Sequence, residues 1–432
     1  MRAHALILRR TRRRPAAALR DRNTAPALLR PALALVAALA LGLAAAQGPQ
    51  LSGRTEAVFG VAVDGSLPVA SAELELRLDG EVGSGFFPDA AYAASVRAGH
   101  DAATGATWLE LDEAHATLFL TDVDITVGKQ RRSWGSTDGV NPVDVLNPRD
   151  LTFPPGNEKI AVPMLYGAVH AGDARVQLAV VPTFTASRLP GEAWRAPLAP
   201  ALPPGVTLVG VLPPEVHEPA ADIGNVQFGA RATLAAGAFD VSATYFNGYR
   251  TEPTASAKLL PAGAPGQFRL QPVLDYDRMQ LLGLDFSGAI GPVVVRGEAA
   301  YEFTSDPEGT DPEVGNHSLQ AVLGGEYAIP SGPRVVLQGI FDYTAPDAGE
   351  DPDLAFKVMT VMTYQAGART NLDLAWMQSL DGSGLAMPGV TYTFADGVVG
   401  EAKAYVFYGA DGSEFGDWKD NSQLRVSVAY SF

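Results

Sequence analysis

The feature that most constrains this chain is a recurring alternation of apolar and polar residues. Residues 73–79 read Glu-Leu-Glu-Leu-Arg-Leu-Asp, and residues 371–376 read Asn-Leu-Asp-Leu-Ala-Trp. A period of two places the apolar side chains on one face of a β-strand and the polar side chains on the other. Segments of this kind recur along the chain at about ten residues each, the length that crosses a bilayer when a strand is tilted.

The connections between these segments form a second regularity, because long and short connections alternate. Bacterial outer-membrane barrels show this asymmetry, since their periplasmic turns are tight hairpins and their external loops are free to grow. The expected long connections are 185–224, 248–276, 304–316, 344–353 and 409–421, with an intermediate one at 380–386. The expected short connections are Gly172-Asp173, Ala236-Gly237, Gly288–Pro292, Pro330-Ser331-Gly332, 365–368 and 395–397.

The two regularities together predict an all-β fold, a single antiparallel transmembrane β-barrel. Strands can span lipid only in a closed barrel, because every backbone N–H and C=O must find a partner within the protein. The segments number eighteen, with sixteen as the main alternative; the first is expected at 55–62 and the sixth at 158–171, and the first three are the weakest. A barrel of that size is too wide for side chains to fill, so an aqueous lumen is expected.

The N-terminus predicts export. Arginine-rich sequence up to Arg30 precedes an uncharged apolar run at residues 31–43 and then three alanines. This order is typical of a secretory signal peptide, and the run is short for a membrane-spanning helix. We therefore expect residues 1–46 to be cleaved after Ala46, residues 47–432 to form the barrel, and the mature protein to reside in the cell outer membrane.

Charge and composition exclude several classes of function. Removing the leader's nine arginines and one aspartate leaves 23 basic and 47 acidic residues, a net charge of −24, which disfavours nucleic-acid binding. The chain has no cysteine, so disulfides and a lipid-anchored cysteine are excluded. It also contains no H-E-x-x-H, G-x-S-x-G or glycine-rich phosphate loop. We therefore expect no enzyme, with a hydrolase at the barrel rim as the less favoured exception.

The last strand carries the sharpest local signal. Its apolar residues alternate up to an aromatic residue at the chain terminus, and this pattern resembles the signature by which outer-membrane barrels are recognised by their assembly machinery. The residues of this expected assembly signal are Leu424, Val426, Val428, Tyr430 and Phe432.

One segment departs from the alternation and resembles a motif of porin-like outer-membrane barrels. The motif has the form G-[KR]-Q-x-x-x-W-G, followed by N-P-x-D and N-P-x-D-L, and here it covers residues 128–151. The resemblance supports the class and names no solute. The segment lies in the third external loop, after short loops near 64–68 and 99–106. In general porins the third loop folds into the barrel and forms the constriction, and residues 131–157 resemble that loop in position.

The charged residues of this segment, together with Trp134, are therefore candidates for a pore constriction. Its basic and acidic side chains would face each other around a narrow lumen and filter solutes. Two alternatives stay open: the charges pair with one another and with the wall merely to pin the loop, or they form an external ligand site. The candidates are Lys129, Arg131, Arg132, Trp134, Asp138, Asp144, Arg149 and Asp150.

Charged residues on the polar faces of the strands are expected to line the lumen. Their excess acidity predicts a mild preference for cations, although wetting of the water-filled interior is the favoured explanation for any single residue. The candidates are Glu73, Glu75, Arg77, Glu110, Asp112, Arg231, Glu298, Glu401 and Lys403. No cofactor and no metal site is expected. Acidic loop segments 306–313, 347–353 and 411–420 leave weak Ca²⁺ binding open, but none has the spacing of a dedicated calcium loop.

These observations favour a porin-like channel for passive diffusion of small hydrophilic solutes or ions. The alternative from another class is a barrel that acts through its surface loops, in adhesion or envelope anchoring, and the proline-rich 185–224 segment is long enough for that. The expected partners are outer-membrane lipid, the barrel-assembly machinery and small hydrophilic solutes. Assembly as a homotrimer is left open.

Overall fold

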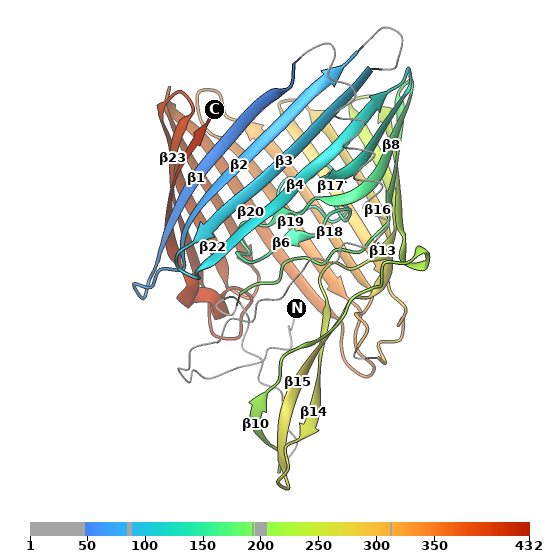
Figure 1. Cartoon of the computed structure of the whole chain (residues 1–432), viewed down its shortest axis with the longest axis vertical. Helices are drawn as coiled ribbons and strands as arrows, with labels where there is room; N and C mark the ends of the chain where they lie inside the picture. The colour runs from blue at the N-terminus through green and yellow to red at the C-terminus, as the bar shows by residue number, and fades with distance from the viewer. Residues whose placement is uncertain (1–47, 84–88, 192–193, 195–204, 312) are drawn as a thin grey trace.

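The computed structural model describes residues 48–83, 89–191, 194, 205–311 and 313–432. The predicted leader at residues 1–46 lies outside the described residues. Eighteen antiparallel strands form one sheet, and its first strand pairs with its last, so the sheet closes into a barrel (Figure 1). The wall strands are β1 (Gln50–Ala62), β2 (Val69–Val82), β3 (Asp89–Asp101), β4 (Ala106–Phe119), β5 (Val123–Gln130), β8 (Val162–Ala171), β9 (Ala174–Val181), β12 (Gln227–Ala236), β13 (Phe239–Tyr249), β16 (Arg278–Ile290), β17 (Val293–Phe303), β18 (Ser318–Ala328), β19 (Arg334–Thr344), β20 (Asp353–Gly367), β21 (Thr370–Ser379), β22 (Gly384–Ala395), β23 (Val398–Tyr408) and β24 (Gln423–Ser431).

This wall confirms the predicted fold class and the count of eighteen rather than sixteen strands. The boundaries differ in places. Strand β1 begins at Gln50 instead of 55, since it continues to pair with β2 up to Asp79. The expected strand at 158–171 is divided: β8 begins at Val162, while β7 (Glu158–Lys159) pairs with β6 (Arg149–Asp150) away from the wall.

The alternation in the sequence separates the two faces of the wall. Leu282, Leu284, Leu323 and Leu337 are more than half exposed on the outside. Asp285 and Gln338, the polar neighbours of Leu284 and Leu337, point inward and are buried against other side chains of the interior. A face of this kind suits contact with lipid chains, because it offers mostly apolar side chains while the backbone is paired within the sheet.

One end of the barrel holds the C-terminus, the start of β1 and tight hairpins, and we call it the terminal end. Four of its two-residue connections contain a glycine with positive φ: Gly172, Gly237, Gly291 and Gly397. A fifth two-residue connection, between β20 and β21, has none. A positive φ matches the twist of a tight hairpin and costs glycine little. The predicted alternation of short and long connections is therefore present.

The opposite end, which we call the loop end, carries the long connections. Residues 182–226 and 250–277 contribute a small sheet that projects beyond the wall (Figure 1): β10 (Thr207–Val211), β11 (Glu215–His217), β14 (Thr254–Pro261) and β15 (Gln267–Asp275). Two short 3-10 helices, η2 (Ile223–Asn225) and η3 (Gly416–Asn421), also lie in loops. Within the described residues, no helix has both the length and the apolar character needed to cross a membrane.

Candidate functional site

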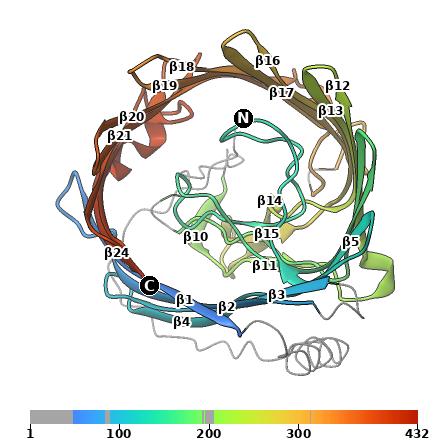
Figure 2. The same cartoon turned by 90° about the horizontal axis from the view of Figure 1, so that it is seen from above.

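Residues 131–161, which we call the inserted loop, leave the wall between β5 and β8 and lie inside the barrel. Figure 2 shows the inserted loop within the ring of strands. The loop contacts strands that are far apart in the wall, because its backbone reaches Glu298 on β17 and its tip lies against β23 and β24. This is the third loop of the loop end, as the sequence predicted.

An irregularity in β4 prepares the place where the loop begins. Ser95 pairs with Glu113 while the next residue, Val96, pairs with Leu111, so Asp112 is an extra residue in β4. Such a β-bulge turns two successive side chains to one face. Arg131 uses both carboxylates: its Nη1 donates to Asp112 Oδ2 at 2.9 Å, and its backbone N–H donates to Glu113 Oε1 at 2.9 Å.

The next basic residue, Arg132, has a different environment. Its Nε donates to Gln130 Oε1 at 2.7 Å, its Nη2 donates to Thr126 Oγ1 at 2.7 Å, and the guanidinium lies 4.4 Å from the centre of the Tyr166 ring. A cation over an aromatic face gains electrostatic attraction from the ring. Arg132 is therefore held to β5 and β8 by neutral groups.

Asn147, the first residue of the second Asn-Pro step, joins the two ends of the inserted loop. Its side-chain oxygen accepts the backbone N–H of Arg132 at 2.8 Å. Its amide donates to the carbonyls of Gln130 at 3.1 Å and Ile160 at 2.9 Å. Since a buried amide must find partners for both its donors and its acceptor, asparagine suits this crossing of three chain segments.

Trp134 is the apolar anchor of the loop and is only 1% exposed. Its ring covers Gly229 of β12, where a Cβ would lie 2.7 Å from the indole. Its Nε1 donates to the Tyr166 hydroxyl at 3.4 Å, and its backbone N–H donates to Asp144 Oδ1 at 3.1 Å. Asp144 also pairs with Arg149 at 3.2 Å and with Lys159.

The far side of the loop is held by β17. The Glu298 carboxylate accepts the backbone N–H of Thr137 at 2.6 Å and that of Ser136. Next to it, Arg296 pairs with Asp138 at 3.1 Å and with Glu326 at 2.8 Å. Glu298 is 4% exposed, so removing its carboxylate would leave buried N–H groups without partners.

Asp150 continues the chain of charges toward β4. It pairs with Arg188 at 2.8 Å, and Arg188 also pairs with Glu110. Burial opposes ionisation of Asp150, but hydrogen bonds from Thr152 and Arg188 outweigh it and hold the pKa of Asp150 below its usual value. The acid is thus charged at neutral pH.

The structure therefore brings seven of the eight predicted constriction residues together inside the barrel. Lys129 is the exception, because alternation puts it on the face opposite to Gln130, beside the outward-facing Val127. Its Nζ donates to the carbonyl oxygen of Leu111. This placement differs from the expectation that Lys129 lines the constriction, and the physical reason is the period of two along β5.

The predicted lumen-lining residues all lie on the inner face, but they divide into two groups. Asp112, Arg231 and Glu298 are less than 10% exposed: the first and last hold the inserted loop, and Arg231 makes a bidentate pair with Asp285. These three do not face open lumen, which corrects the prediction, because the loop or neighbouring side chains cover them. The less buried members are Glu73, Glu75, Arg77, Glu110, Glu401 and Lys403.

Sequence reasoning missed several residues of the site. Tyr166, Lys159 and Arg188 hold the inserted loop, and Phe153 and Arg425 meet where its tip touches β24, 3.2 Å from guanidinium carbon to ring centre. Arg425 was within reach of the sequence, since it occupies a polar position in the alternation of the last strand. The others carry no pattern, because their roles depend on contacts between distant segments.

Residues of the expected assembly signal lie on the outer face of β24 and just beyond it, and each is 44–54% exposed. The Phe432 ring covers Gly53 of β1, where a Cβ would lie 2.3 Å from it, and the backbones of these two residues exchange hydrogen bonds of 2.9 Å. The last residue thus helps to close the barrel.

Carboxylates in the acidic loops find hydrogen-bond or ion-pair partners within the same loop. Asp306 accepts the backbone N–H of Asp311 at 2.6 Å, and Asp411 pairs with Lys419. Within the described ranges, no group of three or more histidine or acidic residues is arranged to hold a metal ion.

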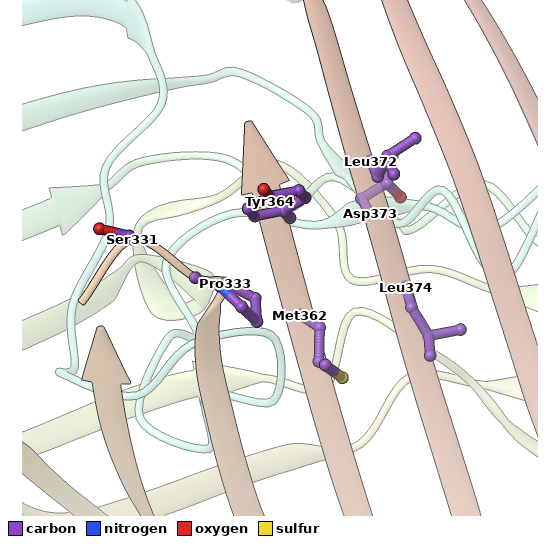
Figure 3. Close-up of a pocket in the computed structure, with 8 residues that line it drawn as sticks. Ser331, Pro333, Met362, Tyr364, Leu372, Asp373 and Leu374 are labelled. Carbon is purple, nitrogen blue, oxygen red and sulfur yellow. The ribbon is translucent and has the colours of Figure 1, made fainter. Parts of the chain in front are cut away.

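Two of the hollows in the described structure differ in where they lie. One, of about 460 Å³, is lined by Met362, Tyr364, Leu372 and Leu374 on the outer face near the turn that contains Ser331 (Figure 3). It belongs to the apolar surface. The other, of about 430 Å³, lies inside the barrel between the loop tip and the wall, and its lining includes Asp150, Phe153, Glu158 and Arg425.

Comparison with known proteins identifies the fold and no family. No family model matches the sequence, and neither does any curated protein. Over 89% of this chain, the structure matches 98% of OccK5 (OpdH) from Pseudomonas aeruginosa, with a TM-score of 0.55 and 9% identity. Looser matches over the same share of this chain include 97% of OmpF from Salmonella typhi, solved with daunomycin (TM-score 0.46, 12% identity), and all of a mutant porin from Rh. blastica (TM-score 0.41, 12% identity). At 9% identity, the OccK5 match shows a shared barrel fold and nothing beyond it.

Proposed function

We propose that this protein is an outer-membrane channel for passive diffusion of small hydrophilic solutes and ions, narrowed by the inserted loop. The observation that carries the proposal is the division of the closed wall into an apolar outer face and a charged inner face, with the loop held across the interior. An eighteen-stranded barrel is too wide for its own side chains to fill, so the loop decides how much of the lumen stays open.

The outer membrane is the compartment that this surface suits. Leu424, Val426, Val428 and Tyr430 are 44–49% exposed on one strand, and comparable rows occur on other strands. Such a surface in water would promote aggregation, whereas lipid chains cover it without cost. Export by a cleaved leader, assembly by the barrel machinery and contact with outer-membrane lipid belong to the same proposal, and so does assembly as a homotrimer.

A mild preference for cations is part of the proposal. It is supported by basic side chains that are each shared between two carboxylates. Arg131 serves both Asp112 and Glu113, and Lys403 lies near both Asp373 and Glu401, at 2.8 and 3.8 Å. One positive charge shared by two carboxylates leaves a local excess of negative charge. An excess of that sign inside a narrow lumen raises the local concentration of cations.

The test is single-channel recording with the purified mature protein in planar bilayers. We expect stepwise conductance in potassium chloride, and a reversal potential in a salt gradient that favours potassium over chloride. Absence of steps would reject the channel. Steps with a preference for chloride would keep the channel and reject the cation preference.

The small sheet at the loop end favours a second candidate function, recognition at the cell surface. It projects beyond the wall and exposes Val209, Val216 and Leu260 by 40–48%. Deleting β10, β11, β14 and β15 with their connections tests the candidate in whole-cell adhesion assays. Loss of adhesion with unchanged conductance would assign the sheet to recognition, and unchanged adhesion would reject this role.

A hydrolase at the rim finds no support at His217, the histidine of the small sheet. Its Nδ1 lies 2.6 Å from Asp275 and its Nε2 lies 2.9 Å from Glu215. A general base needs one ring nitrogen directed at the nucleophile. With carboxylates at both nitrogens, His217 is arranged as a paired cation, so we propose no enzymatic activity.

A further inference from the structure

The gap between the tip of the inserted loop and the wall has features that the proposed channel does not by itself require. Its walls come from β1, β2, β23 and β24 on one side and from residues 150–158 on the other. Its volume of about 430 Å³ lies within the range of small-molecule sites, roughly 300–1,000 Å³. The gap is large enough to hold a solute rather than only to pass ions.

At one place in the gap lies a positive charge that has no direct carboxylate partner among the described residues. The guanidinium of Arg425 rests on the Phe153 ring, and its Nε donates to Gln423 Oε1 at 3.0 Å. Among the described residues, no carboxylate lies within ion-pair distance of Arg425, and no acceptor contacts its two terminal nitrogens. These nitrogens present N–H donors in the plane that a carboxylate matches with two hydrogen bonds.

Aromatic rings extend the surface beside Arg425. Phe153 meets Tyr405 edge to face at 4.9 Å and Trp194 at 5.4 Å. Both Phe153 and Tyr405 line the gap, so their rings offer an apolar platform next to the guanidinium. A solute with an aromatic or other apolar group beside its carboxylate would use both.

The acids that line the same gap are incompletely neutralised. Arg97 is shared between Glu73, at 2.7 Å, and Glu158, at 3.5 Å, and the Glu158 side chain is 68% exposed. A free anion would be repelled by this excess of negative charge, whereas a solute that also carries an ammonium group would be attracted. Since Lys403, the other cation in its lining, is paired with Asp373 and Glu401, the gap offers the Arg425 guanidinium for a carboxylate and an exposed acid for an amine.

We infer that this gap is a binding subsite for small zwitterions that carry both a carboxylate and an ammonium group, such as an aromatic amino acid. Arg425 binds the carboxylate, the Phe153 and Tyr405 rings contact the apolar side chain, and Glu158 faces the ammonium group. The inference deepens the proposed function because it names the class of solute that the constriction selects. Its physiological meaning rests on that proposed function.

The test is binding to the mature protein in detergent micelles, measured by calorimetry with three probes of one skeleton. Phenylalanine is a zwitterion, phenylalaninamide a cation and N-acetylphenylalanine an anion. We expect the wild type to bind phenylalanine most tightly. Arg425→Gln should weaken phenylalanine binding about tenfold or more, since it removes a charge-assisted pair, and should change phenylalaninamide binding far less. Glu158→Gln should weaken both of these probes.

Arg278→Gln is the matched control. Arg278 also lies over an aromatic ring, 5.4 Å from the centre of Tyr249, and within the described chain it has no carboxylate partner, but it does not line the gap. It should leave all three probes unchanged. Equal binding of phenylalanine by wild type and Arg425→Gln, no binding by the wild type, or tightest binding of the anion would each overturn the inference.

Conductance measured on the same preparations distinguishes failure of the subsite inference from failure of the proposed channel function. Normal steps in potassium chloride together with any of those binding results would reject the subsite alone. Absence of steps would reject the channel, and the binding result would then decide the subsite on its own.

Discussion

The inserted loop and the small external sheet are long insertions at the same end of the barrel, and they fold in opposite directions. Residues 131–161 turn inward, where their own backbone pairing is limited to β6 and β7, two residues each. Residues 205–217 and 254–275 turn outward, where β10, β11, β14 and β15 pair with one another. Upstream of β10, Arg188 and Trp194 contact the inserted loop instead.

The difference lies in where the backbone and the charges find partners. The inward loop takes them from the wall, through Asp112, Glu298 and Arg296, and from Asn147 within its own sequence. The outward sheet supplies its own, through the ladder between β14 and β15. A loop that depends on the wall is positioned by it, and this difference supports the proposal that the inserted loop forms the constriction, whereas the sheet projects beyond the wall.

The largest expected effect comes from deleting each insertion. Replacing residues 136–158 by a short glycine-serine linker should raise single-channel conductance severalfold, because the loop crosses the interior. Deleting β10, β11, β14 and β15 should leave conductance unchanged. If instead the sheet deletion opens the channel and the loop deletion does not, the comparison is wrong.

Trp134→Ala should destabilise the protein by about 3–5 kcal/mol, the usual cost of removing a large buried side chain. The residue is 1% exposed and anchors the loop against β12 and β8. The free energy of unfolding in urea measures the effect. Trp376→Ala, at a ring 37% exposed on the outer face, is the control and should cost much less. Equal costs would mean that the loop is not anchored by Trp134.

The sequence predicts the barrel wall better than it predicts the inserted loop or the small sheet. The wall was predictable because a period of two assigns each strand residue to a face. Glycines mark many of its turns, and in the structure those glycines have positive φ. The inserted loop was predictable in place from the motif around Trp134. Its anchoring was not, because Asp112 faces Arg131 only through a bulge, and the partners Glu298 and Arg296 lie about 160 residues away. The small sheet was missed altogether, since its parallel pairs join two separate loops.

Arg131→Gln should increase the preference for cations, because it removes the positive charge that serves both Asp112 and Glu113. We expect the ratio of potassium to chloride permeability to rise roughly twofold. The reversal potential in a salt gradient measures it. Arg278→Gln, which removes an arginine without a carboxylate partner in the described chain, should shift the ratio little. No shift in Arg131→Gln would place this group outside the ion path.

The smallest expected effect concerns His217 in the small sheet. Hydrogen bonds to Asp275 and Glu215 raise the pKa of His217 above 6.5. The protonated ring therefore stabilises the sheet below that pH, and the stabilisation is lost as pH rises through the raised value. Hydrogen exchange of β11 and β15, corrected for its intrinsic pH dependence, should show more protection at about pH 6 than at about pH 9. His217→Asn should abolish the difference, whereas a difference that persists would exclude His217 as its source.

Thiol labelling of conducting channels tests most directly whether solutes pass the tip of the inserted loop. The chain has no cysteine, so Asn157→Cys in the gap introduces a single reactive group, and Leu424→Cys on the outer face serves as the control. A bulky charged thiol reagent should reduce the current through Asn157→Cys and leave the current through Leu424→Cys unchanged. Undiminished current after complete labelling of Asn157→Cys would contradict a pathway past the inserted loop.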